Sequence, residues 1–221
     1  MNSCWIIIPP EIKNDEFYHY IINLISSSTD IKTILEIGAS AGDGSTEAFQ
    51  LGKMNKDIKL FSIEVCTERF NVLKNRYLYD NNFFPYNVSS VSISDFSTKE
   101  TVCSFYNCTK TVLNDYPLDL ILSWHDKDTE YVVKNNIEQA GINKIKIDHN
   151  IDTFDCVLID GSEFTGINEL EQIHGAKYIL LDDIRGFKNY DNHHKLKNDD
   201  KYMCIKENYV VRNGFSVFKL K

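Results

Sequence analysis

A glycine-rich segment follows the first short apolar run of the chain and offers a ligand close access to the backbone. It reads Glu36-Ile37-Gly38-Ala39-Ser40-Ala41-Gly42-Asp43-Gly44-Ser45, so its first three glycines have the spacing G-x-x-x-G-x-G. Glycine tolerates positive φ and close approach, and the free N–H groups of a following helix favour an anionic group. We therefore expect Gly38 to leave space for a ligand. The spacing matches neither the dinucleotide fingerprint nor the phosphate-binding loop, which disfavours a pyrophosphate ligand.

A second candidate is Glu64, which ends the next apolar run. A carboxylate at the end of the second strand of a nucleoside-binding α/β sheet can accept hydrogen bonds from both hydroxyls of a ribose. Together with the glycine segment, Glu64 favours a ligand that contains adenosine. The alternative is a tight turn beside a solvated strand end.

Three further acids follow two later apolar runs. Asp160 ends the run Phe154–Asp160, and Asp182-Asp183 ends the run that starts at Tyr178. If these runs are adjacent parallel strands, the carboxylates meet at one edge, and no basic residue is closer to them in sequence than Arg185. Such a set favours a divalent cation with oxygen ligands, such as Mg²⁺. Exposed strand ends, or an Asp160 that only caps a helix, remain alternatives.

The elements that must position these residues alternate between strands and helices. Strands are predicted at Ile34–Gly38, Leu60–Val65, Asn87–Ile93, Phe154–Asp160 and Tyr178–Asp182, and helices at Glu11–Ser27, Thr46–Gly52 and Arg69–Asp80, from their apolar periodicity. The polar stretch Lys188–Lys201 is predicted to be loose. Alternating parallel units predict a doubly wound α/β sheet whose ligand crevice lies at the carboxyl ends of the strands.

The chain is predicted to end in an antiparallel hairpin. Tyr209–Val211 and Phe215–Phe218 flank Arg212-Asn213-Gly214, and an Asn-Gly pair between apolar runs is a strong hairpin signal. The fold class is therefore a Rossmann-like α/β sheet, mostly parallel, with a C-terminal antiparallel hairpin.

Composition places this fold in a globular protein. The 221 residues are 43% hydrophobic and 25% charged, with a net charge of −8. We expect a single domain over 1–221, with an N-terminal helical segment at 1–30 and the core at 31–221. The acidic balance argues against nucleic acid as a partner, and no segment is long enough to span a membrane. The six cysteines form no C-x-x-C pair, which favours buried free thiols in a cytoplasmic protein.

The glycine segment and Glu64 resemble those of class I S-adenosylmethionine-dependent methyltransferases. Their first motif has the form acid-x-Gly-x-x-x-Gly, which Glu36, Gly38 and Gly42 match, and their second strand ends in an acid, as at Glu64. The resemblance covers about Ile31 to the final hairpin and implies S-adenosylmethionine as cofactor. It implies the cofactor-binding residues Glu36, Gly38, Ala39, Ser40, Gly42, Ser45, Glu64, Val65 and Ser90.

The later acids resemble those of metal-dependent O-methyltransferases, and the Asp-Asp pair is closer to the macrocin-like group that modifies sugars. The resemblance implies that Asp160, Asp182 and Asp183 bind Mg²⁺ or Mn²⁺ and that the acceptor is a hydroxyl of a sugar or glycan. Both groups place a Lys or Asp shortly after the fourth-strand acid, where this chain has Ser162 and Glu163. Asp160 and Glu163 are therefore the predicted catalytic residues, Glu163 as the nearest alternative base, although it could instead cap a helix.

Two other functions stay open at this point. A nicotinamide-dependent oxidoreductase also needs a glycine turn and a second-strand acid, but its G-x-G-x-x-G is absent. A non-catalytic cofactor-binding or scaffold subunit fits the missing family base. Trp124 could line an acceptor pocket, although a core position is favoured. The sequence does not indicate the oligomeric state.

Overall fold

The computed structural model describes residues 9–221, which build a seven-stranded sheet with strand order β3-β2-β1-β4-β5-β7-β6. The strands are β1 (Thr33–Ile37), β2 (Lys59–Ile63), β3 (Phe83–Tyr86), β4 (Cys156–Ile159), β5 (Tyr178–Asp182), β6 (Tyr202–Asn208) and β7 (Phe215–Leu220). The first five are parallel to one another, whereas β7 runs antiparallel between β5 and β6. The predicted fold class is confirmed.

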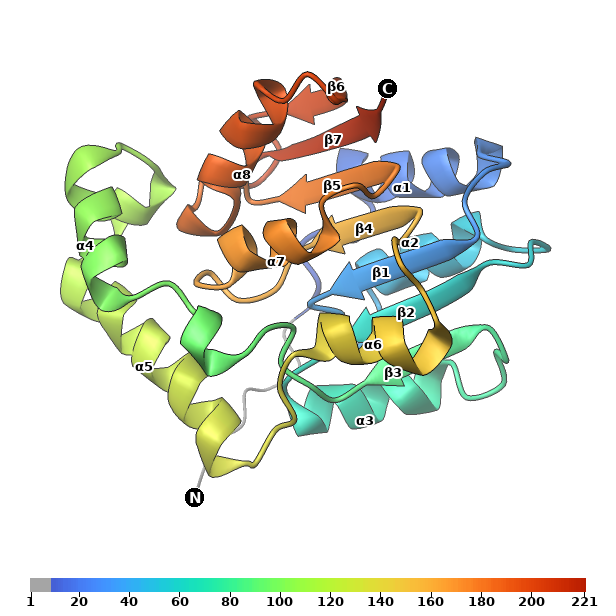
Figure 1. Ribbon diagram of the computed structural model, residues 1–221, viewed down its shortest axis with the longest axis horizontal. Helices are drawn as coiled ribbons and strands as arrows, with labels where there is room; N and C mark the ends of the chain where they lie inside the picture. Colours follow the sequence, from blue (N-terminus) through green and yellow to red (C-terminus); the bar gives the residue numbers. More distant parts are fainter. Residues whose placement is uncertain (1–8) are drawn as a thin grey trace.

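Helices cover both faces of the sheet (Figure 1). Helices α1 (Glu16–Ser27), α2 (Ser45–Gly52) and α3 (Thr67–Arg76) contribute to the core on one face, and α6 (Gly141–His149), α7 (Gly166–Ile173) and α8 (Phe187–Lys197) to the core on the other. Every residue of β4 and β5 is buried. This is why both strands read as apolar runs without alternation.

The third strand lies earlier in the chain than predicted. The structure places β3 at Phe83–Tyr86, whereas the predicted strand Asn87–Ile93 is mostly loop, with one isolated bridge from Val88 to Glu138. Pro85 argues against a central strand, because proline cannot donate to the ladder. It is tolerated here because β3 is the edge of the sheet.

The polar stretch predicted to be loose is also different, because most of it forms α8. Its buried face includes Lys188, Asn189, Asn192 and His193, with Leu196. Four of these are polar, so the helix lacks the apolar periodicity that a sequence pattern detects. The C-terminal hairpin is confirmed, but its first strand ends at Asn208, so Tyr209–Val211 belongs to the connection.

A helical insertion lies between β3 and β4, beyond the carboxyl edge of the sheet. It contains the short 3₁₀ segments η1 (Ile93–Asp95) and η2 (Val112–Asp115) and the helices α4 (Lys99–Cys108) and α5 (Leu118–Lys134). In Figure 1 the arrows of β1 and β5 point toward α4 and α5, which stand to the left of the sheet, whereas the antiparallel β7 points away from them. The insertion is therefore placed to wall a site at this edge.

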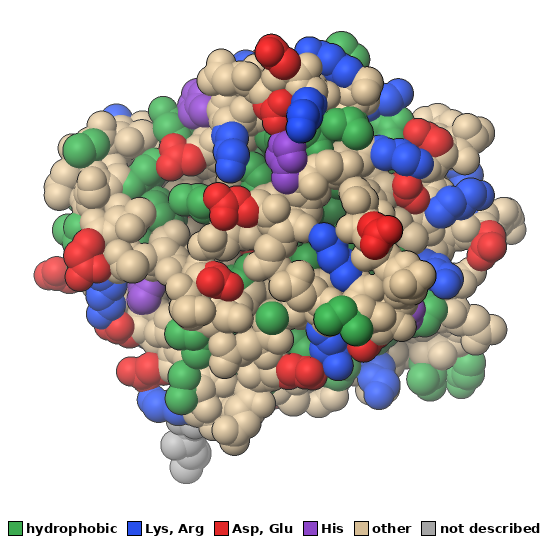
Figure 2. Space-filling view, in the orientation of Figure 1, with side chains coloured by type: hydrophobic (Ala, Val, Ile, Leu, Met, Phe, Trp, Pro, Cys, Tyr) green, Lys and Arg blue, Asp and Glu red, His purple; other side chains and the backbone are tan. Residues whose placement is uncertain are grey.

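Acidic and basic side chains are interspersed on the face of the molecule shown in Figure 2. No helix among residues 9–221 combines the length and apolarity that a membrane crossing requires. The five cysteines in the described part of the chain are free, but only Cys66 and Cys156 are buried, and Cys108 is exposed, contrary to the expected burial. Cys4 lies outside the described residues.

Candidate active site

A cavity of about 570 Å³ opens at the carboxyl edge of the sheet, between the strand ends and α5. Most of the predicted site residues line it, namely Gly38, Ala39, Ser40, Ser45, Glu64, Val65, Ser90, Asp160, Asp182 and Asp183. Glu36, Gly42 and Glu163 are not among the lining residues. The ligand crevice therefore lies where the doubly wound topology predicts it.

Gly38 follows β1 and lies between the two ends of this cavity, one at Glu64 after β2 and the other at Asp160 after β4. It has a φ of +92°, and a Cβ on it would lie 2.0 Å from the carbonyl oxygen of Asp160. The backbone after β4 thus already excludes a side chain at this position. Gly38 also lines the cavity, and the expectation that it leaves space for a ligand stays a prediction. The same closeness places Asp160 directly beside the glycine turn.

Glu36 supports the glycine turn from inside the core. Its fully buried carboxylate accepts hydrogen bonds from the hydroxyls of Ser45 at 2.6 Å, Thr46 at 2.9 Å and Ser62 at 2.6 Å. Burial raises the pKa of Glu36. Because the Ser45 hydroxyl is already bonded to Glu36, both residues act on the shape of the turn.

Gly42 has a structural role away from the cavity. Its φ is +81°, and a Cβ there would lie 2.6 Å from Leu73 Cδ1 on α3. The Tyr77 hydroxyl donates to its carbonyl oxygen at 2.5 Å. Gly42 thus lets the glycine turn pack against α3.

Glu64 presents a carboxylate to the cavity from the end of β2. Its Oε2 accepts from the Ser40 N–H at 2.8 Å, and its Oε1 accepts from the Cys66 N–H at 2.7 Å and lies 3.2 Å from the Arg69 guanidinium. Burial raises the pKa of Glu64, and Arg69 opposes that rise. A carboxylate offers about four acceptor positions, so Glu64 keeps capacity for ligand hydroxyls.

Ser90 lies beside a buried acid that the sequence did not single out. Its hydroxyl donates to Glu169 Oε1 at 2.5 Å, and Glu169 is fully buried on α7. Burial raises the pKa of Glu169. Ser90 reaches the cavity wall from the loop after β3, so its predicted position near the adenine stays a prediction.

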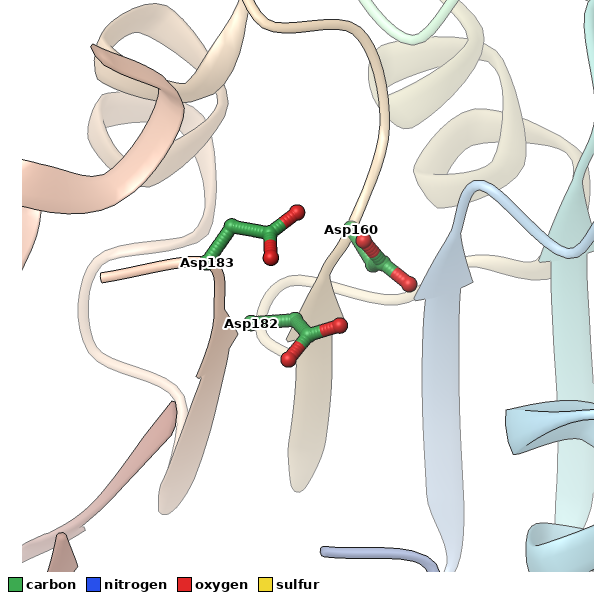
Figure 3. Close-up of side chains that lie close together, drawn as sticks. All are labelled: Asp160, Asp182 and Asp183. Atoms are coloured by element: carbon green, nitrogen blue, oxygen red, sulfur yellow. The ribbon is translucent and has the colours of Figure 1, made fainter. Parts of the chain in front are cut away.

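The three aspartates do converge, as predicted (Figure 3). One carboxylate oxygen from each of Asp160, Asp182 and Asp183 lies within 4.8 Å of the others. Asp183 has a φ of +55°, and the lining residues Ser40 and Arg212 also have positive φ, at 50° and 49°. Uncommon backbone conformations cluster at functional sites, so their concentration at this cavity supports its assignment.

Two cations, both distant in sequence from Asp160, pair with these acids. Lys188 Nζ donates to Asp160 Oδ1 at 2.7 Å and to Asp183 Oδ2 at 3.0 Å. Arg212 Nη1 contacts both oxygens of Asp182, at 2.8 and 2.6 Å. Although no basic residue is closer to these acids in sequence than Arg185, α8 and the β6–β7 connection bring two positive charges to them in space.

Burial and neighbouring acids still shift these carboxyls. Burial raises the pKa of Asp160 to about 6 although Lys188 opposes the rise. Burial and the charges of Asp160 and Asp183 raise the pKa of Asp182 to about 8. The contact with Lys188 instead holds the pKa of Asp183 below its usual value, against the effect of burial. The cluster thus shares its negative charge unevenly.

Glu163 caps a helix in this structure. Its Oε1 accepts from the N–H groups of Phe187 at 2.5 Å and Lys188 at 3.2 Å, at the start of α8. This is the capping contact that free N–H groups at a helix start require. The role of Glu163 as a base stays a prediction, although its carboxylate is bonded away from the cavity wall.

One face of α5 supplies a wall of which the sequence interpretation considered only Trp124, and for Trp124 it favoured a core position. Trp124, Lys127, Asp128 and Tyr131 all line the cavity, with the spacing i, i+3, i+4, i+7 of a single helical face. The Ser162 hydroxyl donates to Asp128 Oδ2 at 2.5 Å, and burial raises the pKa of Asp128. The spacing was visible in the sequence, but its mixed polarity does not distinguish a cavity wall from a solvated helix face.

The N-terminal segment closes the cavity on another side. Pro9–Ile12 line it, and Asp15, the N-cap of α1, accepts from Arg212 Nε at 2.7 Å. Arg212 therefore ties the start of α1 to Asp182 at the end of β5. We call residues 9–15 the N-terminal strap.

Comparison with known proteins links this arrangement to solved structures. No protein-family profile and no curated protein matches the sequence. An O-methyltransferase from Bacillus cereus in complex with S-adenosylhomocysteine (SAH) matches with a TM-score of 0.57, 11% identity, and 96% and 84% coverage of this chain and of that chain. The SAH-bound methyltransferase PaMTH1 of Podospora anserina matches with a TM-score of 0.54, 13% identity, and 96% and 80% coverage.

A methyltransferase from Geobacter sulfurreducens is similar to the same degree, with a TM-score of 0.56, 9% identity, and 95% and 81% coverage of this chain and of that chain. At these identities the likeness concerns the fold. The chain has the Rossmann-like fold seen in these methyltransferases, with the antiparallel β7 beside β5.

Proposed function

We propose that this protein is an S-adenosylmethionine-dependent O-methyltransferase. The observation that carries the proposal is the cavity at the carboxyl edge, in which Glu64 and the glycine turn lie beside the carboxylates that follow β4 and β5. The fold shared with SAH-bound methyltransferases supports it.

The residues at the ends of β1 and β2 fit the cofactor. Glu64 is positioned to accept hydrogen bonds from the ribose hydroxyls, and the backbone from Gly38 to Ser40 borders the same space. Val65 and Ser90 line the side on which we place the adenine. When bound, the cofactor supplies a sulfonium methyl group for transfer to a nucleophilic oxygen.

The residues at the other end of the cavity fit an acceptor rich in hydroxyl groups. Trp124 and Tyr131 offer aromatic surface for the C–H face of a sugar ring, while Asp128 and Asp160 offer oxygens that accept hydrogen bonds from hydroxyls. Within residues 9–221, Arg212 Nη2 is buried without a hydrogen-bond partner, which leaves a donor for an acceptor oxygen. We therefore place a sugar or glycan hydroxyl here, with Asp160 next to the glycine turn as the residue that orients it.

The metal-assisted form of the reaction, predicted from the sequence, does not fit the side chains as they lie. Asp160, Asp182 and Asp183 would have to turn oxygens toward Mg²⁺ or Mn²⁺, but each already accepts from Lys188 or Arg212. Positioning the two reactants can supply much of the rate, and it needs only the residues named above.

A two-stage experiment tests the proposal. Calorimetric titration with SAH and with NAD should show binding of SAH alone, and radiolabelled S-adenosylmethionine should then transfer methyl to members of a sugar and glycan panel. A catechol panel serves as the contrast for acceptor class, and EDTA in the assay tests the predicted need for a divalent cation. Absence of SAH binding by the folded protein would refute the proposal.

A further inference from the structure

The space between the β4 and β5 acids already contains a cation from the chain itself. The Lys188 ammonium bridges Asp160 and Asp183, at 2.7 and 3.0 Å, and the side chain of Lys188 is only 4% exposed. A divalent ion such as Mg²⁺ binds oxygens at about 2.1 Å. It could not share those two oxygens with an ammonium in the same place.

The third carboxylate is occupied as well. Arg212 contacts both oxygens of Asp182 and also pairs with Asp15 on the N-terminal strap. Both contacts come from Nη1, and hydrogen bonds between charged groups such as these are stronger than those between neutral groups. All three potential metal ligands therefore have a positively charged partner.

The backbone of α8 holds Lys188 in place. Glu163 accepts from the Lys188 N–H at 3.2 Å. The next residue, Asn189, donates to the carbonyl oxygens of Ile159 and Asp182, and Asn192, one helical turn along, donates to that of Gly166. The start of α8 is thereby fixed against β4, β5 and α7. Withdrawing the lysine would leave the half-buried carboxylates of Asp160 and Asp183 without this partner, which is costly.

We propose that Lys188 is the resident cation of this three-carboxylate cluster, and that its ammonium takes the place of a divalent metal ion. Lys188 acts as a positioning residue, because it does not line the cavity but holds Asp160 and Asp183, which do. The consequence for the methyl acceptor rests on the proposed function. The acceptor then needs one hydroxyl that bonds to a carboxylate, and not a pair of oxygens that chelate a metal.

The test measures Mn²⁺ binding and requires no methyl transfer, so it does not depend on the proposed activity. Electron paramagnetic resonance and calorimetry follow Mn²⁺ binding to the wild type, to Lys188→Ala, which empties the space, and to Lys188→Gln, which keeps an N–H donor. Lys53→Ala is the matched control. Lys53 is another buried lysine, 6% exposed and 2.6 Å from Asp80, but among residues 9–221 no cluster of three potential metal ligands surrounds it.

The wild type and Lys53→Ala should bind Mn²⁺ no more tightly than about 1 mM, the level of weak oxygen-ligand sites. Lys188→Ala should bind one Mn²⁺ at least about tenfold more tightly, since ligand charge sets affinity, and adding Asp160→Asn should remove that binding. Lys188→Gln should show a smaller gain of the same kind.

Tight, stoichiometric Mn²⁺ binding by the wild type that Asp183→Asn abolishes would overturn the proposal. Equal and weak binding by the wild type and by folded Lys188→Gln and Lys188→Ala would overturn it too. If Lys188→Ala fails to fold without Mn²⁺ but folds when Mn²⁺ is added, the ion has replaced the lysine and the proposal stands. The wild-type titration and the Lys188→Gln titration decide the question if Lys188→Ala does not fold under either condition.

Discussion

The two acidic ends of the cavity are neutralised in different ways. At the end of β2, Glu64 accepts from two backbone N–H groups, those of Ser40 and Cys66, and also pairs with the Arg69 guanidinium. At the ends of β4 and β5, the charge partners are the side chains of Lys188 and Arg212. Backbone donors persist whatever side chain stands at their position, so Glu64 would keep two hydrogen bonds even if Arg69 were replaced. The acceptor end depends on two replaceable side chains and can therefore change without a change of fold.

The largest effect should come from a side chain at Gly38, which would collide with the backbone of Asp160 between the two ends of the cavity. Gly38→Val should lower the free energy of unfolding by about 2 to 5 kcal/mol, because overpacking costs about 1 to 3 kcal/mol and positive φ about 1 to 2 kcal/mol. SAH binding should be lost together with this stability. Urea denaturation and calorimetry measure both.

Gly175→Ala is the matched control for Gly38. Gly175 also has a positive φ, at 103°, but the nearest atom to a Cβ added there would lie 3.9 Å away. It should cost only the backbone term, about 1 to 2 kcal/mol, and leave SAH binding unchanged. Equal loss of stability in the two variants would show that the contact between the ends is unimportant.

The next largest effect should be confined to the acceptor end. Arg212→Met leaves Asp182 buried without its partner, which typically costs about 3 to 5 kcal/mol. Because the pKa of Asp182 is raised to about 8, the carboxyl can take up a proton, and we expect the lower value, about 3 kcal/mol. Arg185→Met, at an exposed arginine of the same region, should stay within about 0.5 kcal/mol. A stability loss no greater than that of Arg185→Met would contradict the pairing.

At the cofactor end, Glu64→Ala should weaken SAH binding by about tenfold to a hundredfold. Loss of hydrogen bonds to a charged acceptor costs about 1.5 to 3 kcal/mol, and each 1.4 kcal/mol is about tenfold in affinity. Calorimetric titration of the folded variant measures the change. Asp57→Ala, at an exposed acid before the other end of β2, is the control and should bind as the wild type does. An unchanged dissociation constant for Glu64→Ala would remove Glu64 from the cofactor site.

The smallest effect is a change in the pH dependence of stability, and it concerns Glu169, the buried acid that accepts from the Ser90 hydroxyl. Burial raises its pKa, so the folded state binds its proton more tightly than the unfolded state does. Stability is then greatest below the unfolded pKa of about 4.3 and falls as pH rises toward the folded pKa, by at most about 1.4 kcal/mol per pH unit. Glu169→Gln should make this fall shallower in urea denaturation at several pH values.

The exposed Glu171 on the same helix provides the control for that series. Glu171→Gln should leave the free energy of unfolding within about 0.5 kcal/mol of the wild type. A Glu169→Gln protein with the same pH dependence as the wild type would show that the proton on Glu169 does not differ between the folded and unfolded states.

Much of the fold could be predicted because its central strands are apolar on both faces. Tyr178–Asp182 was predicted at its observed bounds, and the glycine turn, Glu64 and the three aspartates were placed at the correct edge. These features are local, since each depends on a short run and the residue that ends it. Parallel topology then brings the ends together without further information.

The remaining features depend on contacts between distant segments. Lys188 stands in a polar helix that buries asparagine and histidine, so no apolar periodicity predicted that its side chain is buried. Between Lys188 and its partner Asp160, the chain passes through α7 and β5. Arg212 was assigned to a hairpin turn, although its side chain reaches Asp15 and Asp182. Sequence spacing found the acids but could not show which cations fold back onto them.

The contact between Asp15 and Arg212 also has a consequence for the order of folding. The two residues are 197 positions apart, and contacts between distant residues form late because chain entropy opposes loop closure. Since β7 pairs with β5 and the β6–β7 connection carries Arg212, the last cavity wall assembles only when that hairpin docks. Until that hairpin docks, Asp182 lacks its guanidinium partner, whereas the backbone contacts of Glu64 with Ser40 and Cys66 require only the segments that follow β1 and β2. The Glu64 end of the cavity can therefore form before the Asp182 end.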